Sequence, residues 1–305
     1  MRFHHLDLNL LVVLDALLSE QNITRTAKRL NISQSSTSGL LARLRDYFGD
    51  ELLVQVGRKM HPSPLAQSLA EPVRRVLLDI QSTIVNKPDF DPLTCKRHFK
   101  IVASDFVTTV FLSPLTQRLQ QLAPHISLDI QPTSNQYNEM LTQGEVDFVI
   151  MPDHYLSDMH PKVLLFEDDY QCVVWRENCE VGDQLSLTQY LELGHVAVQF
   201  GSARAPSFDE EFLSRYGKSR RVELTTSSFN TLPHLLVGTR RIAVMQTRLA
   251  ALYATYLPLR VLQSPVELPL LREFMQWNKF LDGDPAHRWM RSLFTEVANQ
   301  TALAV

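Results

Sequence analysis

Apolar residues in the first ninety positions recur at the spacing of α-helices. Ile23, Ala27 and Leu30 lie four and three residues apart, which places them on one face of a helix. Ser33 is a favoured N-cap for a second helix that extends to about residue 48. The pattern returns from Leu65 to about Val85, and it predicts a longer helix there.

Beyond residue 93 the pattern changes to short apolar runs, rich in β-branched and aromatic residues, that alternate with amphipathic stretches. The runs predicted as strands are FKIVAS, ISLDIQP, VDFVIM, YQCVVW, HVAVQF, RVELTT, RIAVMQ, LRVLQS and LREFMQW. The stretches predicted as helices include SPLTQRLQQLAP, NQYNEMLTQG and SFDEEFLSRYG. This alternation favours open α/β sheets that are covered on both faces.

Hydroxyl and amide side chains crowd the start of the helix that follows Ser33. A helix set into the major groove of DNA presents such groups at its N-terminal end, so the two short helices and their tight polar turn indicate a helix-turn-helix. An ordinary pair of amphipathic helices with polar ends would show a similar pattern. The side chains expected at DNA are Thr24, Arg25, Ser33, Gln34, Ser35, Ser36, Thr37, Ser38, Arg43, Arg45, Arg58 and Lys59.

The distribution of charge supports DNA binding. Residues 22–60 hold seven Arg and Lys side chains against three Asp and Glu, although the whole chain has a formal net charge of −3. A local basic surface supplies the salt-dependent part of DNA affinity. Residues 93–305 have a net charge of −4, so we do not expect a second DNA-binding surface there.

Length and composition are those of a globular protein with two or three domains, because the chain has 305 residues, of which 45% are hydrophobic and 21% charged. The sequence shows neither a signal peptide nor a run of about 18 apolar residues. Cys95, Cys172 and Cys179 form no CxxC pair. We therefore expect a cytoplasmic protein, away from the membrane, without a cofactor, a metal site or a disulfide framework.

Two interpretations exist for the helix from Leu65 to about Val85. Its length and its apolar stripe favour antiparallel pairing with a second copy of the chain, since two half-sites on DNA need a symmetric reader. The alternative is that the helix packs on its own domain. The polar segment NKPDFDPLT, with Pro88 and Pro92, predicts a hinge after it.

Catalysis finds little support in the sequence. The ten histidines are scattered, and no HExxH, GxSxG or Gly-rich phosphate loop is present. His195 lies in an apolar run and is interpreted as a structural strand residue. The acidic pairs at 168–169 and 210–211 are better explained as solvated faces, because adjacent side chains diverge on both strands and helices. We therefore expect a protein that is not an enzyme.

Three quoted segments resemble the LysR-type transcriptional regulators. Residues 6–65 match in order, with a first helix at about 6–19, the helix-turn-helix, and a wing from Asp50 to Pro62 that carries DELLVQVGRKMHPSP. The segments FDPLTCKRHFKIVASDF and QWNKFLDGDPAHRWMRSLF resemble the branch that contains the nodulation activators and the regulators of aromatic and chloroaromatic degradation.

The resemblance implies an α/β multidomain fold with three parts. These are a winged helix-turn-helix at 1–62, a linker or dimerisation helix with its hinge at 63–92, and an effector-binding domain at 93–305. The last is expected to be two-lobed and similar to a periplasmic binding protein, with lobe I at about 93–165 and 270–305 and lobe II at about 166–269. Small ligands would bind in the crevice at the carboxyl ends of the strands.

Side chains at these strand ends are candidates for effector binding. Ser104 and the backbone N–H groups after it suit a carboxylate or phenolate, although Ser104 is equally well explained as an N-cap. Phe229 suits a planar phenolic ring, or core packing. Trp277 is a candidate for a wall of the cleft, but packing in the core or between strands is favoured for it. The expected effector-binding residues are Ser104, Asp105, Phe106, Thr108, Asp168, Phe200, Gly201, Ser228, Phe229 and Asn230.

Two positions depart from the family pattern. Ser35 and Ser36 replace the proline and alanine that usually follow the glutamine of the recognition helix. We therefore expect this chain to prefer a different operator sequence from better-known members. Asp168 stands where related aromatic-responsive regulators carry a histidine. The ligand of those regulators is therefore not assumed for this chain.

The family implies a homodimer or homotetramer that binds an interrupted inverted repeat in double-stranded DNA, responds to a small aromatic or phenolic effector, and acts as an activator through RNA polymerase. One alternative is an effector-independent global regulator or antisilencer of the same family. The other is a cytoplasmic solute-binding protein, which would leave the ordered match over residues 6–65 unexplained.

Overall fold

The computed structural model describes residues 2–3, 6–57, 59–80, 90–199 and 219–302. The chain forms two compact units, Met1–Phe90 with Lys279–His287, and Asp91–Asn278 with Arg288–Val305. No helix in the described ranges is long and apolar enough to cross a membrane.

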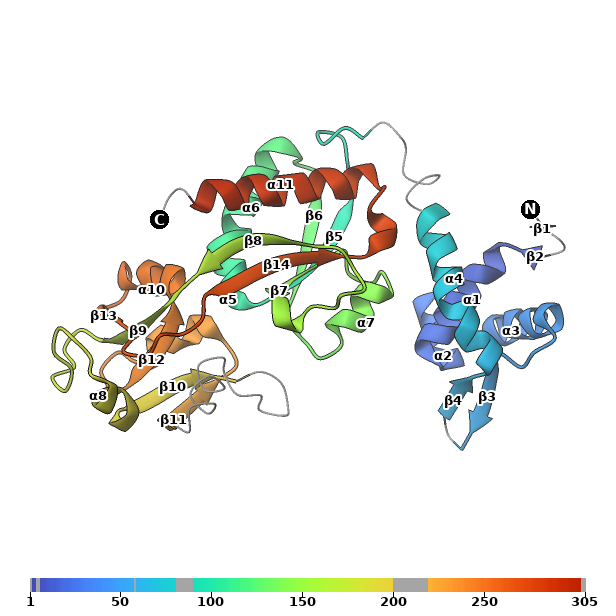
Figure 1. The fold of residues 1–305 in the computed structure, drawn as a ribbon. Helices are drawn as coiled ribbons and strands as arrows, with labels where there is room; N and C mark the ends of the chain where they lie inside the picture. The colour runs from blue at the N-terminus through green and yellow to red at the C-terminus, as the bar shows by residue number, and fades with distance from the viewer. Residues whose placement is uncertain (1, 4–5, 58, 81–89, 200–218, 303–305) are drawn as a thin grey trace. The chain divides into compact units, whose positions relative to one another are not determined.

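The first unit is helical and carries a two-stranded hairpin (Figure 1). Its elements are β1 (Arg2–Phe3), β2 (Leu6–Asp7), α1 (Asn9–Glu20), α2 (Ile23–Arg29), α3 (Gln34–Phe48), β3 (Leu53–Val56), β4 (Lys59–Pro62) and α4 (Pro64–Ile80). β3 and β4 pair antiparallel and form the predicted wing. The core lies where α1, α3 and α4 meet and includes the fully buried Leu14, Leu17 and Leu44.

Local hydrogen bonds and backbone geometry set the helix boundaries. α1 begins at Asn9 and not at the predicted Leu6, because Leu6 and Asp7 pair with β1 and Asp7 Oδ1 accepts from Asn9 N–H at 3.1 Å. Ser33 is the N-cap of α3, as predicted, and its Oγ accepts from Ser36 N–H at 3.0 Å. α3 ends at Gly49, whose φ of 60° is a left-handed conformation that glycine adopts without a steric penalty.

α4 packs on its own domain along one face. Val73 is buried against the first-unit core, and Arg74 binds Asp15 at 2.5 Å and Ser19 at 2.6 Å on α1. Leu65 and Val76 remain 37% and 40% exposed. The packed face agrees with the interpretation that the helix packs on its own domain. The exposed Leu65 and Val76 leave pairing with a second copy of the chain open. The predicted extension of the helix to Val85 lies outside the described residues.

The second unit contains two five-stranded mixed sheets. The strand orders are β6-β5-β7-β14-β8 and β11-β10-β12-β9-β13. The first sheet contains β5 (His98–Ala103), β6 (Ser127–Gln131), β7 (Phe148–Pro152), β8 (Lys162–Asp168) and β14 (Leu271–Trp277). The second contains β9 (Tyr170–Trp175), β10 (Gly194–Val198), β11 (Arg221–Thr226), β12 (Ile242–Gln246) and β13 (Leu259–Gln263). We call the parts of the unit built on these sheets lobe I and lobe II.

All nine predicted strand runs form strands, and β8 is a strand that the sequence prediction missed. β8 leads into β9, and β13 leads into β14, so these two connections join the lobes. β14 pairs antiparallel with both β7 and β8, whereas β5 pairs parallel with β6 and β7. The crossing strands therefore make the sheet mixed, as expected of the two-lobed fold.

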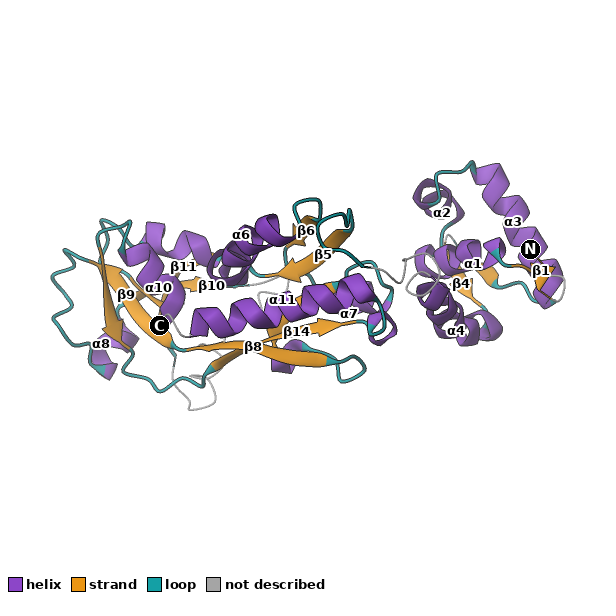
Figure 2. Ribbon diagram, turned by 90° about the horizontal axis from the view of Figure 1, so that it is seen from above, coloured by secondary structure: helices purple, strands orange, loops and turns teal. Residues whose placement is uncertain are grey.

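Helices and short turns cover the sheets (Figure 2). They are α5 (Asp105–Val107), the π-helical turn η2 (Thr108–Leu112), α6 (Ser113–Leu122), α7 (Tyr137–Thr142), η3 (Asp153–Tyr155), α8 (Leu187–Glu192), η4 (Phe229–Leu235), α10 (Thr247–Ala254) and α11 (Pro285–Ala302). The short turn η5 (Lys279–Leu281) belongs to the first unit. Rings of Phe111, Phe148 and Phe294 pack where η2 and α11 meet lobe I. The predicted helix SFDEEFLSRYG lies outside the described residues.

Candidate functional site

The start of α3 exposes a cluster of hydroxyl groups. Ser33 Oγ lies 2.9 Å from Ser35 Oγ and 2.8 Å from Ser36 Oγ, and Gln34, Ser35, Ser36 and Ser38 are all exposed. The backbone N–H groups of the first helical turn lie beside them, so this end of the helix offers both donors and acceptors to a polar partner. It is the part of the unit with the chemistry of a base-reading and phosphate-binding surface.

Other predicted DNA-contacting side chains already have partners within the domain. Thr37 is fully buried, and its Oγ1 donates to Ser33 O at 3.1 Å. Arg45 donates to Glu51 O and Leu53 O, both at 2.8 Å, and so fastens the base of the wing to α3. Arg43 pairs with Asp7 at 3.1 Å but stays half exposed.

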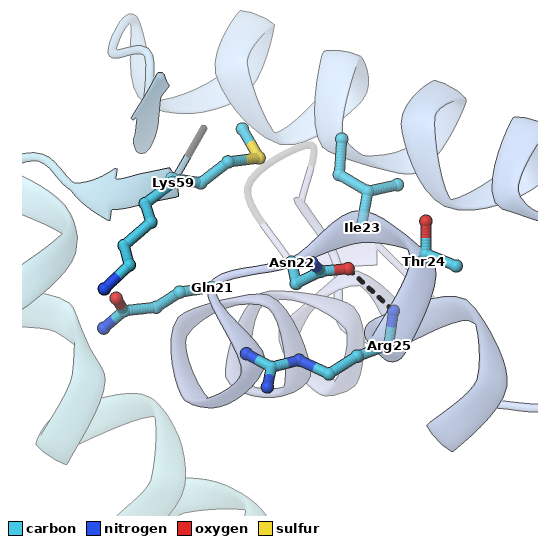
Figure 3. A pocket seen from close by; sticks show the side chains of 7 residues that line it. Gln21, Asn22, Ile23, Thr24, Arg25 and Lys59 are labelled. Carbon is cyan, nitrogen blue, oxygen red and sulfur yellow. Dashed lines mark hydrogen bonds between the residues drawn. The ribbon is translucent and has the colours of Figure 1, made fainter. Parts of the chain in front are cut away.

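A hollow of about 480 Å³ lies between the start of α2 and the wing, and its lining includes Gln21, Thr24, Arg25 and Lys59 (Figure 3). Asn22 Oδ1 accepts from Arg25 N–H at 3.0 Å and sets the first turn of α2. The side chains of Lys59 and Gln21 point toward one another across the hollow (Figure 3). Lys59 and Arg25 flank this concave surface. Arg25 pairs with Glu20 at 3.4 Å but stays 65% exposed, so both cations can be reached by a phosphate backbone. Arg58 lies outside the described residues.

A larger cavity, of about 820 Å³, lies between lobes I and II of the second unit. Its volume falls within the range of sites for small organic ligands. The lining residues are Ser104, Phe106, Thr133, Ser134, Asn135, Gln136, Tyr137, Asn138, Ile150, Met151, Pro152, His154, Tyr155, Tyr170, Val196, Ala197, Val198, Arg220, Phe229, Val244, Gln246, Leu271 and Glu273.

Aromatic side chains give this cavity its character. Phe106 on lobe I and Phe229 on lobe II meet edge to face, with ring centroids 6.1 Å apart. Tyr137, at the start of α7, donates a hydrogen bond to Tyr155 O, which ties two lining segments together. Burial raises the pKa of Tyr137, so its hydroxyl stays protonated. Such a surface suits a planar aromatic ring with polar substituents.

Three of the predicted effector residues line the cavity, namely Ser104, Phe106 and Phe229. Ser104 is also the N-cap of α5, because its Oγ accepts from Val107 N–H at 3.2 Å, so the N-cap interpretation is confirmed and its contact with an effector stays a prediction. Thr108 Oγ1 donates to Ser104 O at 2.9 Å and is not among the lining residues. Phe200 and Gly201 lie outside the described residues.

Asp105 joins the two lobes instead of facing the cavity. Its carboxylate accepts from Ser228 Oγ at 2.7 Å, Phe229 N–H at 3.2 Å and Asn230 N–H at 2.9 Å. Asn230 Nδ2 in turn donates to Asp105 O at 3.3 Å and to Thr109 Oγ1 at 2.9 Å. We call this set of contacts the interlobe latch. Asp105, Ser228 and Asn230 therefore hold each other, and none of them is a lining residue.

Two buried carboxyl groups lie where the strands cross between the lobes. Glu273 lines the cavity and is 3% exposed, and Asp168 is 7% exposed. Desolvation, and secondarily the charge of Asp168, raises the pKa of Glu273 to about 8. Desolvation also raises the pKa of Asp168 to about 6, against hydrogen bonds from the N–H groups of Asp169 and Arg248. Asp168 does not line the cavity, and its effect there is to raise the pKa of Glu273, which does.

Several lining residues were not predicted from the sequence. Thr133–Gln136 follow the end of β6, and Gln246 ends β12, so the rule that ligands bind at the carboxyl ends of strands would have found them. Glu273 is the acidic residue inside the apolar run LREFMQW, which is itself a sign of a buried polar group. Arg220 carries no comparable sign.

The structural interpretation of His195 is confirmed. His195 is fully buried on β10, and its Nε2 lies 2.6 Å from Tyr190 O. Trp277 is half-buried, packs against the Arg291 guanidinium 4.5 Å from its ring centroid, and lines a separate hollow outside the interlobe cavity. Within the described parts of the chain, no three His, Cys, Asp or Glu side chains are grouped as a metal site.

Comparison with known proteins agrees with both units. Residues 8–67 match the bacterial regulatory helix-turn-helix protein, lysR family, and residues 96–299 match the LysR substrate binding domain. Nodulation protein D 1 of Bradyrhizobium diazoefficiens is 42% identical over 302 residues, which cover 99% of this chain and 96% of that protein. Nodulation protein D 2 of Rhizobium tropici is 44% identical over 299 residues, which cover 98% and 95%.

Among solved structures, a probable transcriptional regulator from Pseudomonas aeruginosa is 27% identical, with a TM-score of 0.66 and coverage of 95% of this chain and 98% of that one. These similarities confirm the predicted N-terminal helix-turn-helix, the predicted two-lobed α/β domain after it, and the likeness to nodulation proteins.

Proposed function

Because the chain belongs to the LysR family of DNA-binding transcriptional regulators, which are not enzymes, we propose that it is an activator controlled by a small aromatic or phenolic effector. The effector binds between lobes I and II of the C-terminal domain. The observation that carries this proposal is the cavity of about 820 Å³, because its lining combines aromatic rings from both lobes with amide and hydroxyl groups.

The geometry of the first unit divides the predicted DNA-contacting residues by role. Gln34, Ser35 and Ser38 are exposed at the start of α3 and are assigned to base edges and phosphates, with the hydroxyls of Ser33 and Ser36 beside them. The exposed cations and the neighbouring hydroxyl of Thr24 are assigned to the phosphate backbone. The side chains given these phosphate contacts are Thr24, Arg25, Arg43 and Lys59.

Thr37 and Arg45 are assigned structural roles, since one is buried and the other holds the wing. Their contribution to operator binding is to fix the position of α3 relative to the wing.

Each of the three parts proposed from the sequence is given one role in this regulation. Residues 1–62 read DNA, residues 63–92 link and pair two copies, and residues 93–305 sense the effector in the cytoplasm. The exposed Leu65 and Val76 on α4 supply apolar contacts for a second copy. A dimer or tetramer then binds an interrupted inverted repeat, and its response to effector alters access for RNA polymerase.

An effector changes transcription only if it binds two arrangements of the protein unequally. The two lobes supply such arrangements, because the cavity is lined from both sheets and the interlobe latch spans them. A ligand that contacts both lobes favours the arrangement in which they are close. The new arrangement of the lobes then changes how the subunits of the DNA-bound oligomer are arranged.

DNase footprinting on the DNA upstream of the gene tests the regulator function. We expect a protected interrupted repeat at moderate salt, with Ser35→Ala and Lys59→Ala each weakening protection by roughly tenfold, in the range of one lost polar contact. Gln120→Ala, an exposed change on α6 of the second unit, serves as the control and leaves protection unchanged. Absence of any protected site with folded protein would contradict the proposal.

A further inference from the structure

Lobe I carries a second hollow, of about 370 Å³, on the side of its sheet where α11 runs beside β14 (Figure 2). Its volume lies in the lower part of the range of sites for small organic ligands. Strands β8 and β14 and helix α11 supply its walls. The lining residues are Val163, Met275, Trp277, Arg288, Arg291, Ser292, Thr295 and Glu296, and none of these eight lines the interlobe cavity.

The strands give the hollow an apolar floor. Met275 is fully buried on β14, and Val163 of β8 lies directly opposite it in the strand pairing. Trp277 follows two residues later on β14, so its side chain leaves the same face of the strand, where it is half-buried. A thioether, a branched aliphatic group and an indole ring thus form a surface for the hydrocarbon part of a ligand.

Helix α11 gives the hollow a polar rim. The rim residues lie at positions i, i+3, i+4, i+7 and i+8 of the helix and therefore share one face, namely Arg288, Arg291, Ser292, Thr295 and Glu296. The Arg291 guanidinium lies over the Trp277 ring, 4.5 Å from its centroid, and this cation–π contact holds a positive charge beside the floor. Arg288 lies one turn earlier and is exposed.

The charges of the lining favour an anion. Arg288 and Arg291 contribute two positive charges to the rim. Glu296 is the acidic residue of the lining, and its carboxylate pairs with Arg118 at 3.5 Å, so its negative charge is offset by a residue outside the hollow. Guanidinium groups bind carboxylates through two parallel N–H donors, which gives both strength and orientation.

We propose that this hollow is a second ligand site, which binds a small organic carboxylate with an apolar body. The carboxylate accepts from the guanidinium groups of Arg288 and Arg291, and the body packs on Met275 and Trp277. All the contacts come from lobe I, so binding here needs neither lobe II nor the interlobe cavity.

The test uses 4-iodobenzoate and the full-length protein, with isothermal titration calorimetry and tryptophan fluorescence. Iodine quenches an indole that it contacts, so binding in the hollow lowers the emission of Trp277. We expect Arg291→Gln to weaken the binding that causes quenching by about tenfold or more, as for a lost charge-assisted hydrogen bond. Arg272→Gln removes the same charge at an exposed position of β14 outside the hollow, and it retains the affinity of the wild type.

A second variant tests the shape of the hollow without changing its charge. Ser292→Phe places a ring in the hollow from an exposed position of α11, so the helix stays folded and 4-iodobenzoate no longer quenches. Trp277→Phe keeps an aromatic floor, so quenching falls while the affinity measured by calorimetry stays within about threefold of the wild type. Circular dichroism checks the fold of each variant.

A neutral probe of the same size isolates the effect of charge. 4-Iodobenzamide replaces the carboxylate by an uncharged amide, and we expect it to bind the wild type at least about tenfold more weakly than 4-iodobenzoate does. Equal quenching and equal affinity in the wild type, Arg291→Gln and Ser292→Phe would overturn the inference, because the probe would then bind elsewhere. A wild type that does not bind 4-iodobenzoate at millimolar concentration would overturn it as well, whereas the footprint decides the regulator function separately.

Discussion

At the scale of single residues, Glu273 makes the stability of the effector domain depend on pH. Its pKa is raised to about 8 in the fold by burial and by the nearby Asp168, from an ordinary value of 4.5. Between these values the folded state holds a proton that the unfolded state releases, so stability falls as pH rises and levels off above about 8. Glu273→Gln removes this loss.

The measurement is the melting temperature at pH 6.5 and at pH 8. Both pH values lie above the pKa of about 6 of Asp168, whose carboxylate accepts from the Arg248 backbone N–H, so Glu273 is the carboxyl that titrates between them. We expect the wild type to lose more stability across the window than Glu273→Gln. A difference of about 1 kcal/mol would appear as roughly 2–4 °C in a domain of this size. Parallel curves for the two proteins would show that Glu273 is ionised in the fold.

At the scale of elements, the interlobe latch connects the start of α5 to the start of η4. Asp105→Ala removes the acceptor for three donors, two of them backbone N–H groups, so the closed arrangement of the lobes loses its direct connection. We expect amide hydrogen exchange at residues 228–231 to accelerate by about tenfold or more, in line with lost bonds to a charged acceptor. Exchange in β5 and β7 stays as in the wild type.

Thr108→Val is the matched control for this element. The Thr108 hydroxyl donates to Ser104 O within the same segment and does not reach lobe II, so its removal leaves exchange at residues 228–231 unchanged. Equal acceleration in both variants would mean that Asp105 supports its own lobe and not the contact between lobes.

The latch also shows how far the sequence predicts the site. Strand ends and their polar residues were located correctly, because apolar runs and the residues after them are local features. The contacts of Asp105 with the backbone of Phe229 and Asn230 depend on how the two lobes meet, which no local pattern contains. The strand β8 was missed because KVLLFED combines a continuous apolar run with charged ends, and such a run does not distinguish strand from helix.

At the scale of the whole molecule, the exposed side of α4 determines whether the protein works as an assembly. Leu65 and Val76 are eleven residues apart on this helix, which corresponds to about three turns, so both fall on nearly the same side. The adjoining face is already used, since Val73, which lies about 60° round the helix from Val76, is buried in the domain core. The apolar residues that remain exposed are therefore the ones available to a second copy.

Val76→Glu places a charge in the proposed pairing surface without disturbing the buried side of the helix. We expect light scattering to show a shift toward monomer, and affinity for DNA with two half-sites to fall by about tenfold or more, because two tethered heads bind with a high effective concentration. Affinity for a single half-site changes little. Gln67→Glu adds the same charge at another exposed position of α4 and keeps the assembly intact. If Val76→Glu retained both its mass and its two-site affinity, α4 would serve only its own domain, and the pairing of subunits would have to come from the effector-binding lobes.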